Sequence, residues 1–184
     1  MGARPSPRAP SSERIRRSLD RILKKNVLCA VATVAAGGRA HIHICYFAVS
    51  PRLELFFLSD PRSRHAANLR RRPSAAIAVF SSAQSWGGPD RGAQLFGSCA
   101  RVPPGGQLWA RRIYSDRFPG LARNRSVRKL AFYRFAIQRA TVLDEREFGD
   151  AVLADWSARG RRRPAPRGRD GHPASKGAST ARSK

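Results

Sequence analysis

The residues best suited to chemistry in this chain lie in one short segment, DPRSRHAANL, at residues 60–69. Ser63 supplies a hydroxyl, Arg64 a guanidinium group and His65 a titratable ring, where a helix is predicted to begin. The free amides and the dipole of a helix N-terminus add to these groups, so together they suit a phosphate of about two negative charges. For this stretch alone, a solvated basic first turn is the simpler interpretation. Asp60 would also repel a phosphate unless its carboxylate points away.

Other candidate residues lie in predicted strands. His41 and His43 alternate onto one strand face, but His172 falls in a predicted tail and no thiol or carboxylate has supporting spacing, so we predict no metal site. Gln94 stands between apolar neighbours in RGAQLFG, residues 91–97, which looks like a buried strand. A buried glutamine commonly bonds a nearby backbone group, for example at a bulge. No Ser/His/Asp triad, pair of carboxylates or activated cysteine is evident, so no catalytic acid or base is named.

Helices and strands are predicted from the spacing of apolar residues and from caps and turn residues. The predicted helices are residues 11–26, 60–73 and 105–118, and the predicted strands are two runs within 27–49 that turn at Gly37 and Gly38, then 53–59, 74–80, 92–102 and 130–143. In the second helix we expect Asp60 as the cap and Pro61 at the first helical position. In the third we expect Leu108, Ile113 and Tyr114 to pack. Short antiparallel strands with few helical crossovers favour a barrel with peripheral helices, because closure removes exposed edges.

The chain has 184 residues and a formal net charge of +24. Residues 1–10 and 157–184 are mixtures of Pro, Gly, Ser and Arg with little to bury, so we predict flexible basic tails around one folded domain at 11–156. Clustered basic residues usually attract nucleic acid. Arg far exceeds Lys, however, and Ala, Gly and Pro are plentiful, so part of the charge reflects a coding bias.

The cysteines and the hydropathy predict the compartment. Cys29, Cys45 and Cys99 are widely spaced in apolar runs without metal-binding spacing, which is typical of reduced, buried thiols. No window approaches the roughly 18 apolar residues of a membrane span, and the N-terminus lacks the apolar segment of a signal peptide. We therefore predict a cytoplasmic protein with no membrane contact.

The run from Ala30 to Phe80 resembles the flavin split barrels related to pyridoxamine 5′-phosphate oxidase. It contains in order a Gly-turned hairpin, LELFFLSD, SRHAANL and AAIAVF. RGAQLFG and YSDRFP, residues 114–119, are similar to the R-G-V-Q-F-x-G and Y-x-x-R-F-P segments of a poorly characterised branch of this superfamily. The resemblance covers roughly residues 27–143. It implies a mainly β, α+β fold: a six-stranded antiparallel split β-barrel with peripheral helices.

The resemblance also implies FMN as the cofactor. An S-R-K-A segment helps to hold the FMN phosphate in the family; Ser63, Arg64 and Ala66 match it, and His65 stands in place of Lys. Phe57 falls on the aromatic strand that runs beside the cofactor.

Two strand residues complete the candidate site. The family's fifth strand lies near the flavin at a dimer interface, where the amide of Gln94 would bond the cofactor or the partner chain. The oxidases carry an Arg and, five residues later, a Lys on the second strand; here these positions are His43 and Ala48. His43 is expected to contact the phosphate or the flavin ring, or else to be bonded at the barrel surface. These departures remove the grounds for naming pyridoxamine phosphate as the substrate.

Three classes of function follow from this interpretation. The favoured one is an FMN-dependent oxidoreductase that acts on an unknown small molecule as a homodimer. The second is a split barrel that binds haem or a deazaflavin, or only stores flavin. The third is a nucleic-acid-associated module whose basic tails make non-specific contacts.

Overall fold

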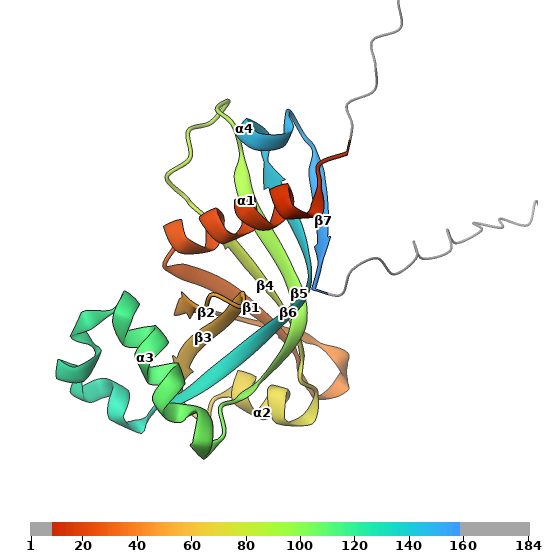
Figure 1. The fold of residues 1–184 in the computed structure, drawn as a ribbon. Coiled ribbons are helices and arrows are strands. Elements are labelled where there is room, and N and C mark those ends of the chain that lie inside the picture. Colours follow the sequence, from red (N-terminus) through yellow and green to blue (C-terminus); the bar gives the residue numbers. More distant parts are fainter. Residues whose placement is uncertain (1–8, 159–184) are drawn as a thin grey trace, which may run out of the picture.

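Seven antiparallel strands form one sheet that closes on itself (Figure 1). The computed structural model describes residues 9–158, apart from the side chains of Ala122 and Arg125, so most of both predicted tails lies outside the described residues. The strands are β1 (Leu28–Val34), β2 (Ala40–Val49), β3 (Glu54–Ser59), β4 (Ser74–Phe80), β5 (Arg91–Arg101), β6 (Ala131–Asp144) and β7 (Leu153–Ser157). Their order is β3-β2-β1-β4-β5-β6-β7, and pairing of β3 with β6 closes the first six into a barrel. The predicted six-stranded antiparallel barrel is confirmed.

Strand β7 is absent from the predicted elements. It pairs with β6 from Leu143 to Arg139 after a turn in which Gly149 has a φ of 95°. Its sequence, LADWS, is only five residues long, fully buries Ala154 alone, with Trp156 partly buried, and contains no β-branched residue. Neither the alternation nor the composition of a typical strand is therefore present to reveal it.

Helices lie at the ends and on one side of the barrel. They are α1 (Ser12–Lys25), α2 (Arg64–Arg71), α3 (Gln107–Arg117) and α4 (Glu145–Phe148), with short 3-10 turns η1 (Ala36–Gly38), η2 (Pro104–Gly106), η3 (Pro119–Arg123) and η4 (Arg125–Lys129). Helix α1 begins at its Ser11 cap and ends at Asn26, as predicted, and α1 and α2 lie at opposite ends of the barrel (Figure 1). None of the helices in the described residues is long and apolar enough to cross a membrane.

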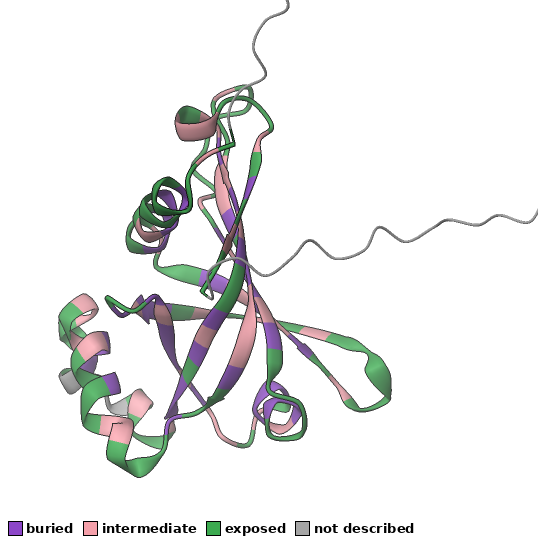
Figure 2. Ribbon diagram, turned by 45° about the vertical axis from the view of Figure 1, so that its right-hand side comes forward, coloured by how far each residue is buried: buried purple, intermediate pink, exposed green. Residues whose placement is uncertain are grey.

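The buried residues form two clusters on opposite sides of the barrel wall (Figure 2). The larger one fills the barrel and includes Leu19, Ile22 and Leu23 of α1, which closes its upper end. The smaller one lies between the outer face of the wall and α3. Tyr114 packs there as predicted, but Leu108 is 84% exposed, so its predicted packing is wrong. Leu108 is the second residue of α3, and the buried face of this helix is formed instead by Ala110 and Tyr114.

Arg117, in the YSDRFP segment, connects α3 to the end of α1. Its guanidinium group donates to the carbonyls of Leu23 at 3.1 Å and Lys24 at 3.0 Å, and also to that of Asn26. The last carbonyls of a helix have no intrahelical partner, and a cation there also interacts favourably with the helix dipole.

Arg117→Ala is expected to lower the free energy of unfolding by about 2 kcal/mol, because it removes hydrogen bonds from a charged donor to partly buried carbonyls. Urea denaturation measures the effect. Arg112→Ala, at an exposed position of the same helix, is the matched control and should change stability little. Equal stability of the two variants would contradict this role for Arg117.

Candidate cofactor site

The predicted anion-binding segment forms the first turn of α2. Ser63 is the helix cap, and its hydroxyl accepts from the amide of Ala66 at 3.3 Å. Asp60 was expected to cap this helix, and that prediction is wrong. Its carboxylate instead accepts from the Arg62 amide at 2.8 Å, because the helix begins one turn later. This bond holds the pKa of Asp60 below its usual value and directs the carboxylate to its own turn.

Three histidine rings lie next to this helix terminus. The His65 ring stacks on the His43 ring with centroids 3.6 Å apart and on the His41 ring at 6.1 Å. His41 and His43 reach it from one face of β2, as their alternation predicted. Nε2 of His65 is 2.9 Å from the Ser63 hydroxyl and is also hydrogen-bonded to Ser59. The sequence analysis did not identify Ser59, the last residue of β3, because no motif distinguishes it.

Burial and repulsion between the rings lower the pKa values of His43 and His65. The pKa of His43 is lowered from 6.5 to about 4, first by burial and then by the charges of His65 and His41. Burial, followed by His41, also lowers the pKa of His65. Both ring nitrogens of His43 are buried without a hydrogen-bond partner in the described chain, and the nearby Val31 backbone offsets the lowering of its pKa only in part. An unpaired buried polar group is costly, so a ligand that bonds His43 would remove that cost.

The free protein is expected to lose stability as the pH falls from 6.5 toward 4.5. The unfolded chain gains a proton at His43 near pH 6.5, whereas the folded protein does not until about pH 4. Below pH 4.5, Glu145 and Glu147, whose pKa values are lowered in the fold, add a loss of their own. Chemical denaturation at several pH values measures the slope. His43→Leu should flatten it between pH 6.5 and 4.5, and an unchanged slope would contradict the assignment.

The structure brings most of the predicted site residues together. Phe57 lies in the core next to His43, with ring centroids 5.8 Å apart, and stacks on Tyr133 at 5.5 Å. Arg64 is exposed at the start of α2, beside the Ser63 cap. An anion at this helix terminus would therefore meet a surface guanidinium and the partly buried hydroxyl and imidazole groups. Within the described residues, no group of His, Cys, Asp and Glu side chains is arranged to hold a metal ion.

Gln94 is the exception, and its predicted burial is wrong. Ala93 and Leu95 face the core, so strand alternation turns Gln94 to the outside, where it is exposed. The pairing registers of β1, β2, β4 and β5 place Gln94 in one row across the outer face with Ala78, Ala30 and Ile44. Gln94 is thus a polar residue in the middle of an apolar surface and lies away from the histidines.

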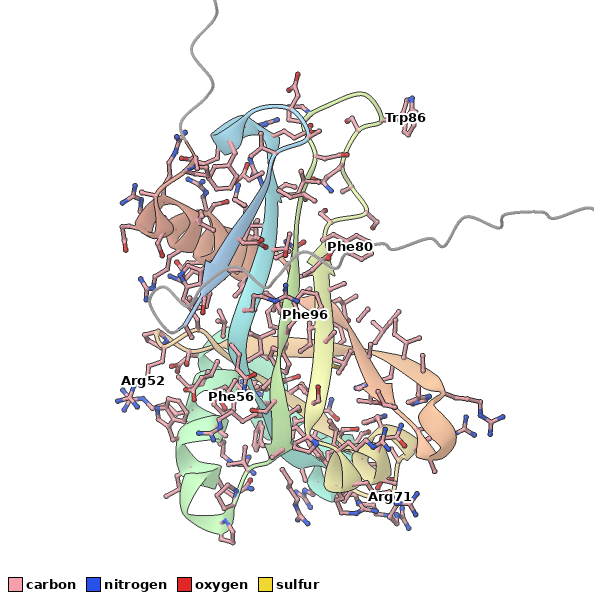
Figure 3. The ribbon with its side chains drawn as sticks, turned by 90° about the vertical axis from the view of Figure 1, so that its right-hand side faces the viewer. Arg52, Phe56, Arg71, Phe80, Trp86 and Phe96 are labelled. Carbon is pink, nitrogen blue, oxygen red and sulfur yellow. The ribbon has the colours of Figure 1, made fainter. Side chains whose placement is uncertain are left out.

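That outer surface carries large apolar side chains in solvent. Ile42, Ile44, Tyr46 and Phe80 are each more than half exposed, at 65, 72, 55 and 59%. Phe80 and Phe96 can be followed along the β4–β5 wall in Figure 3. The face comprises the outer residues of β1, β2 and β4, and those of β5 as far as Phe96, before its bulge. Apolar surface of this extent is unusual for a monomer and marks an interaction site.

A groove of about 630 Å³ borders this face between β2 and the α3–η4 segment. Ile44, Tyr46 and Phe118 line it together with the two motif residues Tyr114 and Arg117. Tyr114 is 7% exposed, and burial raises its pKa to about 12, so it keeps its proton at neutral pH. Arg117 is bonded to α1. Both side chains therefore shape the groove through packing.

The cysteines form a cluster that the sequence did not predict. Cys29 and Cys45 are directly opposite in the β1–β2 register, with their sulfur atoms 3.7 Å apart. All three thiols are free, and Cys45 is only half-buried. Burial raises the pKa of Cys99 to about 12, and hydrogen bonding to Cys45 followed by burial raises that of Cys29, so these two remain protonated.

Comparisons with known proteins agree with this architecture. The profile of the pyridoxamine 5′-phosphate oxidase family matches residues 15–144. No curated protein sequence matches the chain.

Three solved structures illustrate the range of similar folds. A haem binding protein from Mycobacterium smegmatis has 17% identity and a TM-score of 0.65. The match covers 80% of this chain but only 58% of that one. A FAD-binding protein from Mesorhizobium loti has 18% identity and a TM-score of 0.55, covering 67% of this chain and 89% of its own. A putative pyridoxamine 5′-phosphate oxidase from Listeria innocua has 13% identity and a TM-score of 0.56, and the match covers 69% of this chain and 96% of that one.

At these identities the likeness shows the fold alone, while the family profile covers well over half of the chain. The narrower branch, inferred from RGAQLFG and YSDRFP, stays a prediction. With a closed six-stranded barrel and the matched profile, the chain belongs to the pyridoxamine 5′-phosphate oxidase-like family of FMN-binding split barrels.

Proposed function

We propose that this protein is an FMN-dependent oxidoreductase that binds the cofactor phosphate at the N-terminus of α2. The observation that carries the proposal is His43, whose buried ring nitrogens have no partner and which lies against His65 beside the Ser63 cap. A phosphate there would bond Ser63, Arg64 and the first amides of the helix. His43 would donate to it once the nearby negative charge raised its pKa.

The flavin would supply the redox chemistry by accepting and passing on hydride or electrons. The described residues would hold and orient it. Phe57 and Tyr133 stack on each other in the barrel next to His43, and the groove beside α3 offers an apolar chamber for a small-molecule substrate. Tyr114, protonated throughout the neutral range, could donate a hydrogen bond there but not act as a base.

One observation favours haem as the second candidate. Iron binds the neutral form of imidazole, and the lowered pKa values of His43 and His65 keep both rings neutral. A related fold is described as a haem binding protein. A single histidine would be the ligand, because the His43 and His65 rings are parallel and their in-plane lone pairs cannot converge on one iron.

An absorption spectrum of the purified full-length protein tests the proposal, followed by titration with FMN and, separately, with haemin. We expect the absorption bands of a bound flavin and stoichiometric binding of FMN. A Soret band with no FMN binding would replace the proposal by the haem alternative. A colourless protein that binds neither would end both.

We further propose that the protein is a homodimer joined through the apolar outer face. The face lies next to the groove, so a second copy would supply the groove's missing wall, and Gln94 would meet the partner chain. Ala78→Glu is expected to give a monomer by light scattering, because it buries an unpaired carboxylate in the interface. Ala100→Glu, at an exposed position of β5 beyond its bulge, is the control and should stay dimeric. A dimeric Ala78→Glu variant would exclude this face.

A further inference from the structure

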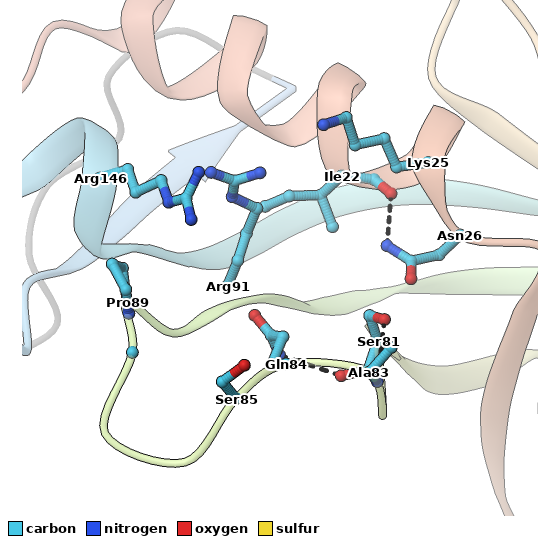
Figure 4. Close-up of a pocket in the computed structure, with 11 residues that line it drawn as sticks. Ile22, Lys25, Asn26, Ser81, Ala83, Gln84, Ser85, Pro89, Arg91 and Arg146 are labelled. Atoms are coloured by element: carbon cyan, nitrogen blue, oxygen red, sulfur yellow. Dashed lines mark hydrogen bonds between the residues drawn. The ribbon is translucent and has the colours of Figure 1, made fainter.

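A second pocket lies at the opposite end of the barrel from α2. It has a volume of about 550 Å³ and is formed by the end of α1, the β4–β5 loop at residues 81–90 and the start of α4 (Figure 4). This volume is in the range of small-molecule sites and is too small for a folded partner. None of the residues assigned to the cofactor site lines it.

The pocket is lined by three cations and by no carboxylate. Lys25, Arg91 and Arg146 are the cations. Neither Lys25 nor Arg146 forms an ion pair within residues 9–158. Arg91 uses only its Nε atom, 3.1 Å from the buried carboxylate of Asp144. Figure 4 shows Arg91 and Arg146 turned toward each other, although like charges repel. An anion between them would convert this repulsion into two attractions.

The nearby acids are already occupied. Asp144 also binds Arg21 and accepts from the Ser18 hydroxyl at 2.5 Å. Glu147 pairs with Arg14 at 2.7 Å and Arg21 at 2.9 Å. The carboxylate of Glu145, on the α4 side, accepts from the backbone amides of Asp90 and Ala151, which keeps its pKa low. Glu145 therefore stays ionised on the α4 side, and the pocket cations that no carboxylate pairs within residues 9–158 are Lys25 and Arg146.

The end of α1 would ordinarily disfavour an anion, because the C-terminus of a helix is negative. Here Arg117 occupies the carbonyls of Leu23, Lys24 and Asn26, and the Asn26 amide occupies that of Ile22 at 2.8 Å. This removes the main electrostatic objection to an anion in the pocket.

The β4–β5 loop adds neutral donors and an aromatic ring. The hydroxyls of Ser81 and Ser85 and the amide of Gln84 line the pocket. Trp86, in the same loop, is fully exposed and projects from the molecule in Figure 3. Trp86 does not line the pocket but directly follows the lining residue Ser85. An exposed tryptophan in this loop is a suitable stacking surface for a planar base.

We propose that this pocket binds the phosphate groups of a nucleoside diphosphate, at a site separate from the flavin. Lys25, Arg91 and Arg146 contact the phosphates, Ser81 and Gln84 bond their oxygens, and Trp86 stacks on the base. A nucleoside diphosphate and free pyrophosphate both carry a diphosphate group, so free pyrophosphate is the alternative ligand.

Isothermal titration of the full-length protein with ADP, pyrophosphate and adenosine tests the proposal. ADP is expected to bind one site per chain, pyrophosphate more weakly and adenosine not measurably. Arg146→Ala and Lys25→Ala should each weaken ADP binding about tenfold, the effect of one lost charge-assisted hydrogen bond. Arg52→Ala removes the same charge at an exposed position elsewhere and is the matched control, with binding unchanged within about twofold.

Trp86→Ala should weaken the binding of ADP and leave the binding of pyrophosphate unchanged. Prior saturation of the protein with FMN should leave ADP binding intact. Equal losses in Arg52→Ala and Arg146→Ala would show that the binding is non-specific and overturn the site. Equal affinities for ADP and pyrophosphate would overturn the nucleotide. Competition between FMN and ADP would overturn the separation of the two sites. If ADP does not bind at all, the pocket is not a nucleotide site.

Discussion

Gly97→Ala is expected to destabilise the barrel by roughly 3 kcal/mol or more, the upper end of the cost of overpacking a core. A Cβ atom at this position would lie 2.0 Å from the backbone oxygen of Ala136 and 3.2 Å from the ring of Phe135. The register between β5 and β6 shifts between Phe96 and Gly97, so the two backbones approach closely here. Backbone cannot move aside as the end of a side chain can.

Guanidinium denaturation of the variant measures this effect. Gly105→Ala is the matched control, since a Cβ there meets nothing within 4 Å, and its stability should change by less than about 0.5 kcal/mol. A Gly97→Ala variant as stable as the control would show that the bulge is placed wrongly. The expected loss of stability would also explain Gly97, the last residue of RGAQLFG, as a requirement of the barrel rather than of a ligand.

Arg64→Ala is expected to weaken FMN binding by about 10- to 100-fold, because a hydrogen bond from a charged donor to phosphate contributes about 1.5–3 kcal/mol. Arg64 is exposed, so its removal leaves the fold intact and the loss is specific to the ligand. Fluorescence titration of FMN measures the dissociation constant. Arg71→Ala, in the last turn of the same helix and exposed (Figure 3), should bind FMN as the wild type does.

Equal affinities of the Arg64→Ala variant and the wild type would remove the phosphate from α2. Ser63→Ala is a less suitable test, because Ser63 also caps the helix and its loss would lower stability.

Periodicity and turn chemistry predicted most of the fold. The six barrel strands, the hairpin at Gly37 and Gly38 and the three longer helices were all recovered, because most of them bury one clear face and turn residues separate them. Gln94 was placed on the wrong face for a physical reason. The outer wall is also apolar, so residues 91–97 show no polar alternation from which the strand's orientation could be read.

Long-range proximity was beyond the sequence. The contact of His43 with His65 depends on how β2 and α2 meet, and that of Cys29 with Cys45 on the register of one strand pair. Residues 63–65 were found because their types and the start of the helix are local signals. The partners of those residues could not be found in the same way, because no local spacing encodes a contact across the barrel.

Binding of a phosphate group at the first turn of α2 is tested most directly by comparing FMN with riboflavin, which lacks that phosphate. Equilibrium titration of the full-length protein should give about 100-fold tighter binding of FMN, and Arg64→Ala should remove most of the difference. Equal affinities of the wild type for the two flavins would contradict the account.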